Sequence, residues 1–218
     1  NFKPDNGKYE VDYAGVTALV VTLIPLLIAL SWGGVEYPWN SMQIFGMFAL
    51  SAVALIVFIL IEKKSKAPII PLWIFKNQIV SLSLITTFLS GLAMFGGIVF
   101  LPLFFQGVLG LSATATGNFL TPMMLSMVFG SAVSGVALSR AGGHYKVQGA
   151  IGMAFVALGL LLLSTMSIET SIVRAMVYII LVGVGLGVSM PIYTIAVQNT
   201  VSYDVLGVAT STVPFFRS

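Results

Sequence analysis

The stretch GVALSRAGGHYK, residues 135–146, lies between two long apolar runs, residues 115–138 and 147–167. At about 1.5 Å per residue, each run is long enough as a helix to cross a hydrocarbon core about 30 Å thick. Arg140 and Lys146 would each cost about 2.5 to 3.5 kcal/mol at the bilayer centre, so the stretch belongs at a water interface. It therefore predicts two membrane spans joined by a short basic loop, and its positive charge favours the cytoplasmic side.

The composition of the whole chain also indicates a membrane protein. Of the 218 residues, 58% are hydrophobic and 8% are charged, and the mean hydropathy is +1.04. Soluble domains carry much more polar surface than this. The net charge of +3 does not indicate nucleic-acid binding, because the Lys and Arg residues are scattered through loops between apolar runs. Cysteine is absent, which excludes disulfides and thiolate chemistry.

The apolar runs predict an all-α, polytopic membrane bundle with six full spans and the start of a seventh. The full spans are expected at residues 13–31, 39–61, 79–103, 115–138, 147–167 and 174–197. The chain accordingly divides into a connector (1–12), a first pair of spans (13–61), a basic and interfacial linker (62–78) and a larger helical part (79–218). Because Asn1 is not a start residue and the seventh run stops at Ser218, we expect an internal piece of a longer protein.

The positive charges fall almost entirely on one side of the predicted membrane. Counting alternate loops places nine of the ten Lys and Arg residues on that side and leaves Arg174 for the other. The nine are Lys3, Lys8, Lys63, Lys64, Lys66, Lys76, Arg140, Lys146 and Arg217. Short cytoplasmic loops collect Lys and Arg, so the amino end of the chain is expected in the cytoplasm.

The basic loop resembles the signature between two spans of major facilitator superfamily transporters. Gly135, Arg140 and Gly142 occupy matching positions, and Ser139 stands where that signature has an acid. Three further stretches resemble the fourteen-span EmrB/QacA-type drug:proton antiporters: SWGGVEYPW (31–39), LPLFFQGVLGLSATATGNFLTP (101–122) and GVGLGVSMP (183–191). The resemblance implies that residues 13–61 are the extra central span pair, and that residues 79–218 are a truncated carboxyl-terminal transporter half.

The same resemblance implies a secondary transporter that works by alternating access, with its cavity between two halves near the bilayer midplane. The expected function is multidrug efflux at the cell membrane, meaning export of apolar or amphipathic compounds by proton antiport. An exporter of an endogenous metabolite or lipid on the same scaffold is the alternative. A non-transport bundle or an intramembrane enzyme is the second alternative, but the predicted spans hold no Cys, His or acid for a catalytic site. We therefore expect no enzyme.

Two groups of motif residues are candidates for function, and each also has a simpler interpretation. The first group would form a cytoplasmic gate and consists of Gly135, Arg140 and Gly142. The sequence favours the simpler interpretation, in which Arg140 is a cation at the carboxyl end of a helix. The small residues and the proline of the sixth span would serve in helix packing or as a hinge. These are Gly183, Gly185, Gly187 and Pro191.

Four polar or aromatic residues are candidates for lining the substrate cavity: Gln106, Asn118, Phe95 and Tyr193. The alternatives are interfacial solvation for the amides and lipid or helix contacts for the rings. The two amides come first because no charge surrounds them. His144 has no acid or Cys nearby in its loop and is expected to be solvated.

The acids bear on proton coupling, because a proton carrier must lie where the membrane field and the substrate both reach it. All seven fall in connectors or at the ends of predicted spans: Asp5, Glu10, Asp12, Glu36, Glu62, Glu169 and Asp204. We therefore expect no carboxyl in this chain to be buried deeply enough to raise its pKa toward neutrality, and we expect the coupling residue in a missing amino-terminal half. The expected partners are a small-molecule substrate, protons, the lipid bilayer and that half, with no nucleic acid, cofactor or metal ion.

Overall fold

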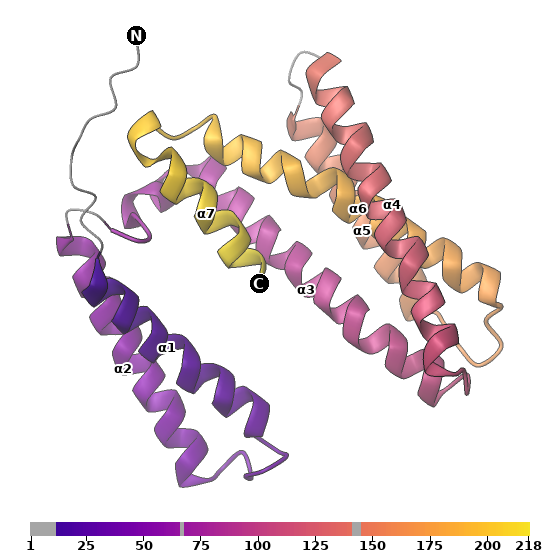
Figure 1. The fold of residues 1–218 in the computed structure, drawn as a ribbon, viewed down its shortest axis with the longest axis horizontal. Coiled ribbons are helices and arrows are strands. Elements are labelled where there is room, and N and C mark those ends of the chain that lie inside the picture. Colours follow the sequence, from indigo (N-terminus) through magenta and orange to yellow (C-terminus); the bar gives the residue numbers. More distant parts are fainter. Residues whose placement is uncertain (1–11, 66–67, 141–144) are drawn as a thin grey trace. The chain divides into compact units, whose positions relative to one another are not determined.

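The computed structural model describes residues 12–65, 68–140 and 145–218. These residues form seven α-helices and two 3-10 helices (Figure 1). In order, they are α1 (Tyr13–Trp32), α2 (Met42–Lys64), η1 (Leu72–Lys76), α3 (Gln78–Gly107), α4 (Ala113–Arg140), α5 (Tyr145–Ser164), α6 (Ile172–Gln198), η2 (Tyr203–Val205) and α7 (Leu206–Arg217). Helices α1 to α6 are each long and apolar enough to cross a membrane, so the prediction of an all-α polytopic bundle is confirmed.

Three boundaries differ from the expected spans in ways that matter for function. Helix α3 continues past Pro102 to Gly107, because a proline removes only one donor from the backbone ladder. Helix α2 continues to Lys64, which places Glu62 inside the helix rather than in a connector. Arg217, counted above with the loops of the cytoplasmic side, lies in helix α7 rather than in a loop.

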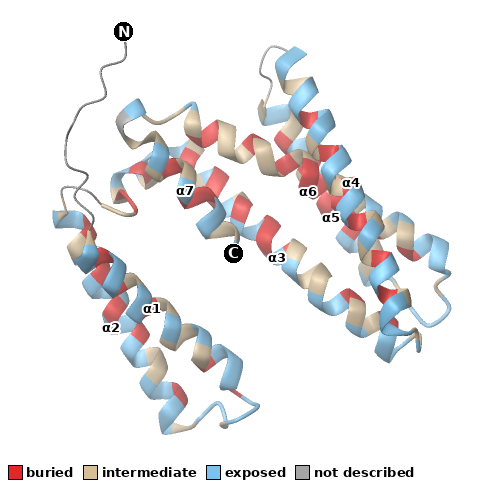
Figure 2. Cartoon of the chain, in the orientation of Figure 1, coloured by how far each residue is buried: buried red, intermediate tan, exposed pale blue. Residues whose placement is uncertain are grey.

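The chain forms two compact units, which meet in sequence between Trp73 and Ile74. Helix α6 is the centre of the second unit. Half of its apolar window is buried, against 22% or less for each of the other five candidate spans. Its buried positions are visible as the red segments of α6 in Figure 2. The reason is that α4 and α5 both pack against α6, while α7 packs on α3.

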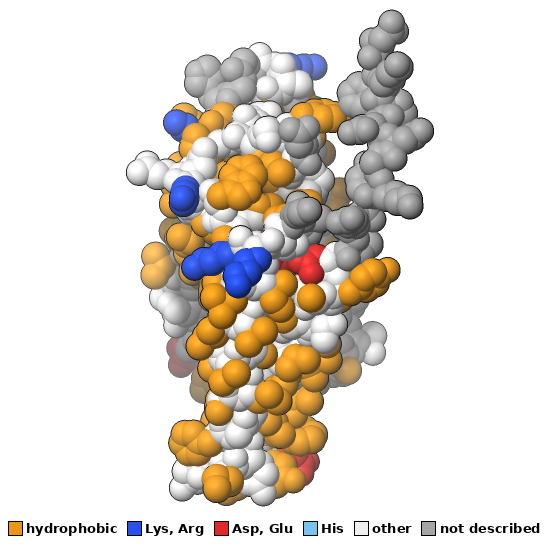
Figure 3. Space-filling model, turned by 90° about the vertical axis from the view of Figure 1, so that its left-hand side faces the viewer, with side chains coloured by type: hydrophobic (Ala, Val, Ile, Leu, Met, Phe, Trp, Pro, Cys, Tyr) orange, Lys and Arg blue, Asp and Glu red, His pale blue; other side chains and the backbone are white. Residues whose placement is uncertain are grey.

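The first unit is a hairpin of α1 and α2, joined by a turn in which the Trp39 ring covers Gly33 and Gly34. Gly34 has a φ of +78°, a conformation that side chains disfavour. The two helices are tied together by the Ser51 hydroxyl, which donates to the Thr22 carbonyl at 2.7 Å. Many hydrophobic side chains of α1 and α2 are exposed, and they cover much of the face seen in Figure 3, as expected for a helix pair surrounded by lipid.

The segment before α3, expected to lie along the membrane interface, is anchored in the second unit by Ile74. This residue of η1 is 1% exposed. It belongs to a buried cluster with residues of α3, α6 and α7, which are Val80, Leu84, Val197, Ala209 and Val213. The entry to α3 is therefore fixed by apolar packing.

Candidate functional site

The glycines of α6 lie at the closest helix contacts of the second unit. A Cβ on Gly183 or Gly187 would overlap a backbone carbonyl of α4, that of Met123 or Met127 respectively. A Cβ on Gly185 would lie 2.6 Å from the Gly152 carbonyl oxygen of α5. Residues four apart share a helix face and residues two apart do not, so α4 and α5 approach α6 from different sides. Pro191 lies within the same helix, one turn beyond Gly187.

A cavity of about 680 Å³ opens beside these contacts, between α3, α4 and α6. Five of the ten methionines of the chain line it, together with smaller apolar residues. The five are Met94, Met123, Met124, Met127 and Met190. The Ser131 hydroxyl is the one polar side-chain group among the lining residues that the structure describes. We call this space the methionine cavity.

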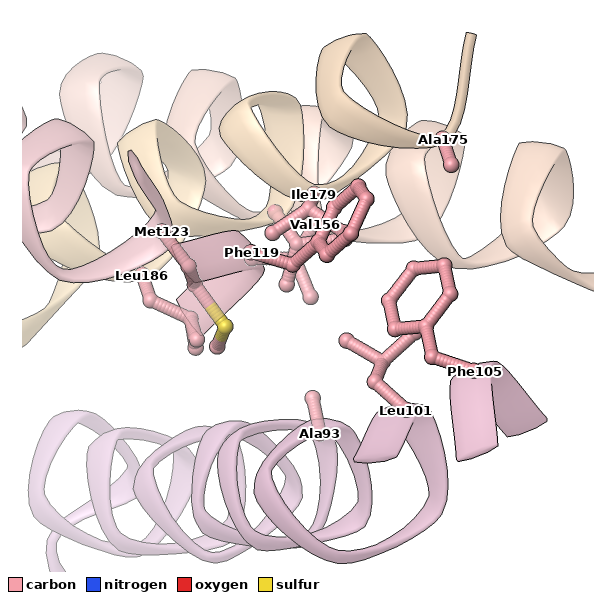
Figure 4. Close-up of a cluster of buried hydrophobic side chains, with 10 residues drawn as sticks. Ala93, Leu101, Phe105, Phe119, Met123, Val156, Ala175, Ile179 and Leu186 are labelled. Carbon is pink, nitrogen blue, oxygen red and sulfur yellow. The ribbon is translucent and has the colours of Figure 1, made fainter. Parts of the chain in front are cut away.

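One wall of the methionine cavity is continuous with the main buried core. Met123 is 3% exposed and belongs to a cluster in which Phe105 of α3 stacks on Phe119 of α4, with ring centroids 4.3 Å apart. Figure 4 shows the α3 side chains Ala93, Leu101 and Phe105 facing those of α4 and α6. The cavity thus has flexible thioether walls beside a buried aromatic cluster, and such walls suit apolar ligands of varied shape.

The four cavity candidates from the sequence lie elsewhere. Gln106 and Asn118 are exposed near the ends of α3 and α4. Phe95 is 45% exposed and lines a smaller pocket on another face of α3. Tyr193 donates to the Gly149 carbonyl at 3.4 Å and lines a separate pocket near the start of α3. Of the sequence-based candidates, Gly187 lines the methionine cavity.

The basic loop is only partly described. Gly135 lies in α4 with nothing within 4 Å of its Cβ position, and Arg140 is the exposed last residue of that helix. Gly142 and His144 lie outside the described residues. A cation at this helix end interacts favourably with the helix dipole, so the simpler interpretation of Arg140 fits its position.

Comparison with known proteins identifies the family. Residues 13–218 match the sequence profile of the Major Facilitator Superfamily. The chain belongs to this superfamily. It is 40% identical to multidrug transporter protein MdtP of Bacillus subtilis (strain 168) over 216 residues, which are 99% of this chain and 40% of MdtP. It is 37% identical to multidrug resistance protein 3 of the same bacterium over 214 residues, 98% of this chain and 41% of that protein.

A fungal relative, MFS-type transporter gkaD of Penicillium citrinum, is 32% identical over 209 residues, 95% of this chain and 36% of gkaD. This major facilitator chain thus spans about 40% of the length of the curated relatives it matches. Its membership in a family of multi-pass membrane transporters confirms the expectation of a transporter rather than an enzyme.

Glu62, expected in a connector or at a span end, is a buried carboxyl of this major facilitator chain. The side chain is 4% exposed. Its oxygens accept hydrogen bonds from the backbone N–H groups of Ile69 at 3.2 Å and Ile70 at 3.1 Å. These two amides lie between Pro68 and Pro71, which have no N–H to donate. Glu62 therefore ties the end of α2 to the linker that follows.

A second carboxylate lies beside Glu62 at the start of α1. A Cβ on Gly15 would lie 2.9 Å from an Asp12 oxygen and 3.0 Å from a Glu62 oxygen, so glycine leaves room for both acids. The Asp12 carboxylate caps α1 by accepting from the Gly15 N–H at 2.7 Å. Hydrogen bonds from the Ser65 hydroxyl and from this N–H hold the pKa of Asp12 below its usual range. Both acids therefore have structural partners.

Proposed function

We propose that this chain forms the central span pair and the carboxyl-terminal half of a fourteen-span multidrug exporter driven by proton antiport. The methionine cavity is the observation that carries the proposal. Apolar walls with few polar groups select for hydrophobicity rather than for one hydrogen-bonding pattern. The printed names of MdtP and multidrug resistance protein 3, at 40% and 37% identity, support the same function.

The lining of the cavity supports a broad substrate range. Methionine has three rotatable bonds and a polarisable sulfur, so its side chain repacks around ligands of different shape. Promiscuous binding surfaces commonly use such flexible, Met-rich walls. The glycine contacts of α6 support the transport cycle, because backbones that touch without intervening side chains can shift with little repacking. In this proposal, rocking of the transporter halves exposes the cavity alternately to the two sides of the membrane.

We expect Lys64 to face the cytoplasm and Glu36 to face the opposite side. Lys63 and Lys64 end α2, and the clustering of Lys and Arg on one side predicts this orientation. Both positions are exposed, and the chain has no cysteine, so a single introduced cysteine reports directly on its own side. In intact cells an impermeant maleimide should label Glu36→Cys and spare Lys64→Cys. The reverse labelling pattern would show that the assigned orientation is inverted.

If the transporter is a proton antiporter, adding substrate to proteoliposomes of the complete transporter should move protons across the membrane in the direction opposite to the substrate. Glu62 and Asp12 already have hydrogen-bond partners at a span end, so we place the proton carrier outside this chain. Substrate-induced proton movement, measured with a pH-sensitive dye, should persist in Glu62→Gln and in Asp12→Asn. Its loss in either well-inserted variant would locate the carrier here, and its absence from the wild type would refute antiport.

A further inference from the structure

The methionine cavity gathers thioether sulfur atoms, a feature that binding of apolar compounds does not by itself require. Three of its methionines also pack together at the main buried core. Met123 is 3% exposed and belongs to that core, and the partly buried Met94 and Met127 pack against it. Met94 comes from α3, and the other two come from α4. Sulfur atoms from two helices are therefore available to one ligand in the cavity.

The positions of these side chains allow their sulfur atoms to converge. Met123 and Met127 are four residues apart on α4, so they share a helix face with Cβ atoms about 5 to 6 Å apart. The Met123 Sδ lies 4.0 Å from the position that a Cβ on Gly97 of α3 would take. Met94 lies three residues before Gly97, on the same side of α3. Figure 4 shows the Met123 side chain directed from α4 toward α3. Rotations of the flexible thioether chains can bring the three sulfurs onto one ion.

The chemistry of these donors selects one class of metal ion. Thioether sulfur is a soft ligand and favours soft ions such as Cu(I), whereas harder ions prefer oxygen or nitrogen donors. Among the residues that the structure describes, no group of three or more His, Cys, Asp or Glu side chains could hold a metal ion. A cation in an apolar cavity is costly unless groups of the wall replace its water. Three sulfurs provide that replacement for a soft ion.

We propose that Met94, Met123 and Met127 bind one soft monovalent metal ion, Cu(I) or Ag(I), in the methionine cavity. The inference rests on the proposed export function, because it makes such an ion a second class of cargo for the same cavity. Apolar compounds use the volume and hydrophobicity of the walls, whereas the ion uses the sulfur atoms. Replacing sulfur while keeping the apolar volume therefore separates the two uses.

Leucine makes this replacement, because exchange of methionine for leucine nearly conserves volume and is well tolerated in cores. Binding of Ag⁺ is measured by equilibrium dialysis on the purified complete transporter in nanodiscs, in buffer without chloride or thiols. The double variant Met123→Leu/Met127→Leu should bind one Ag⁺ per transporter at least tenfold more weakly than the wild type. Met166→Leu/Met176→Leu is the matched control and should bind as the wild type does. Its two methionines pack against the same core but do not line the methionine cavity.

Met94→Leu is the second variant and tests the sulfur that α3 contributes. It should also weaken Ag⁺ binding at least tenfold. Thioethers carry no proton to lose, so wild-type binding should be equal at about pH 5.5 and about pH 7.5, whereas His or Cys ligands would bind more weakly at the lower pH. Absence of Ag⁺ binding by the wild type, or unchanged binding in both leucine variants, would overturn the proposal.

The neutral fluorophore N-phenyl-1-naphthylamine reports whether the cavity itself is intact. Each leucine variant should bind it within about twofold of the wild type, because the apolar volume is kept. Parallel loss of fluorophore and Ag⁺ binding would overturn the proposal, since it would assign the effect to the shape of the cavity rather than to sulfur. Selective loss of Ag⁺ binding, together with no export of either ligand from cells by the wild type, would support the metal site and refute the export function alone.

Discussion

Replacing Gly187 by valine is expected to remove most of the folded transporter from the membrane. A Cβ at this position overlaps the backbone carbonyl oxygen of Met127, and a backbone atom cannot rotate out of the way as a side chain can. Helices α4 and α6 must then move apart, although their contact is the most extensive between any two helices of the described residues. We expect a loss of about 3 kcal/mol, the upper end of the usual cost of overpacking a core.

Gly117→Val is the matched control for this substitution. Gly117 lies in α4 with nothing within 4 Å of its Cβ position, so valine adds bulk without a collision. Thermal unfolding of the purified complete transporter, with membrane level measured in parallel, should separate the two variants clearly. Wild-type stability in Gly187→Val would show that α4 and α6 do not pack as described.

Filling the methionine cavity is expected to abolish export while leaving the fold intact. Ala132 lines the cavity from α4 and its side chain is exposed, so tryptophan at this position has room to enter the cavity. Efflux of N-phenyl-1-naphthylamine from preloaded cells should fall at least tenfold in Ala132→Trp, because substrate and indole would occupy the same volume.

The neighbouring residue supplies the control for Ala132→Trp. Val133 is 47% exposed and does not line the methionine cavity, although it lies in the same turn of α4. Val133→Trp therefore adds a large ring to the same helix and should leave efflux within about twofold of the wild type, in keeping with the small effect of most surface substitutions. Equal efflux by both variants, at equal membrane levels, would contradict the location of the substrate site.

The membrane helices could be predicted from the sequence because their apolar runs have the length that a bilayer demands. The glycines of α6 could be singled out for a related reason, since small residues four apart allow two backbones to approach. The sequence did not predict which residues of each helix face the protein interior. A helix in lipid is apolar on all sides, so periodicity does not show which of its residues face inward. Met123 and Met127 lie four apart, yet only the meeting of α3, α4 and α6 makes them a cavity wall.

Polar residues were misplaced for a different reason. Glu62 lies one residue beyond the expected end of its span at residue 61, where the sequence alone does not distinguish a loop from the last turn of a helix. The carboxylate of Glu62 is held by hydrogen bonds from the backbone N–H groups of Ile69 and Ile70. The flanking prolines after α2 have no N–H group, so these two amides are the donors within that short stretch. That arrangement brings together residues seven and eight positions apart and depends on the path of the linker.

The most direct test of the export account is equilibrium binding of N-phenyl-1-naphthylamine to the complete transporter in nanodiscs. We predict saturable binding to the wild type and to Val133→Trp, and binding at least tenfold weaker to Ala132→Trp. Binding that is equally tight in all three proteins would contradict the account, because it would place the substrate outside the methionine cavity.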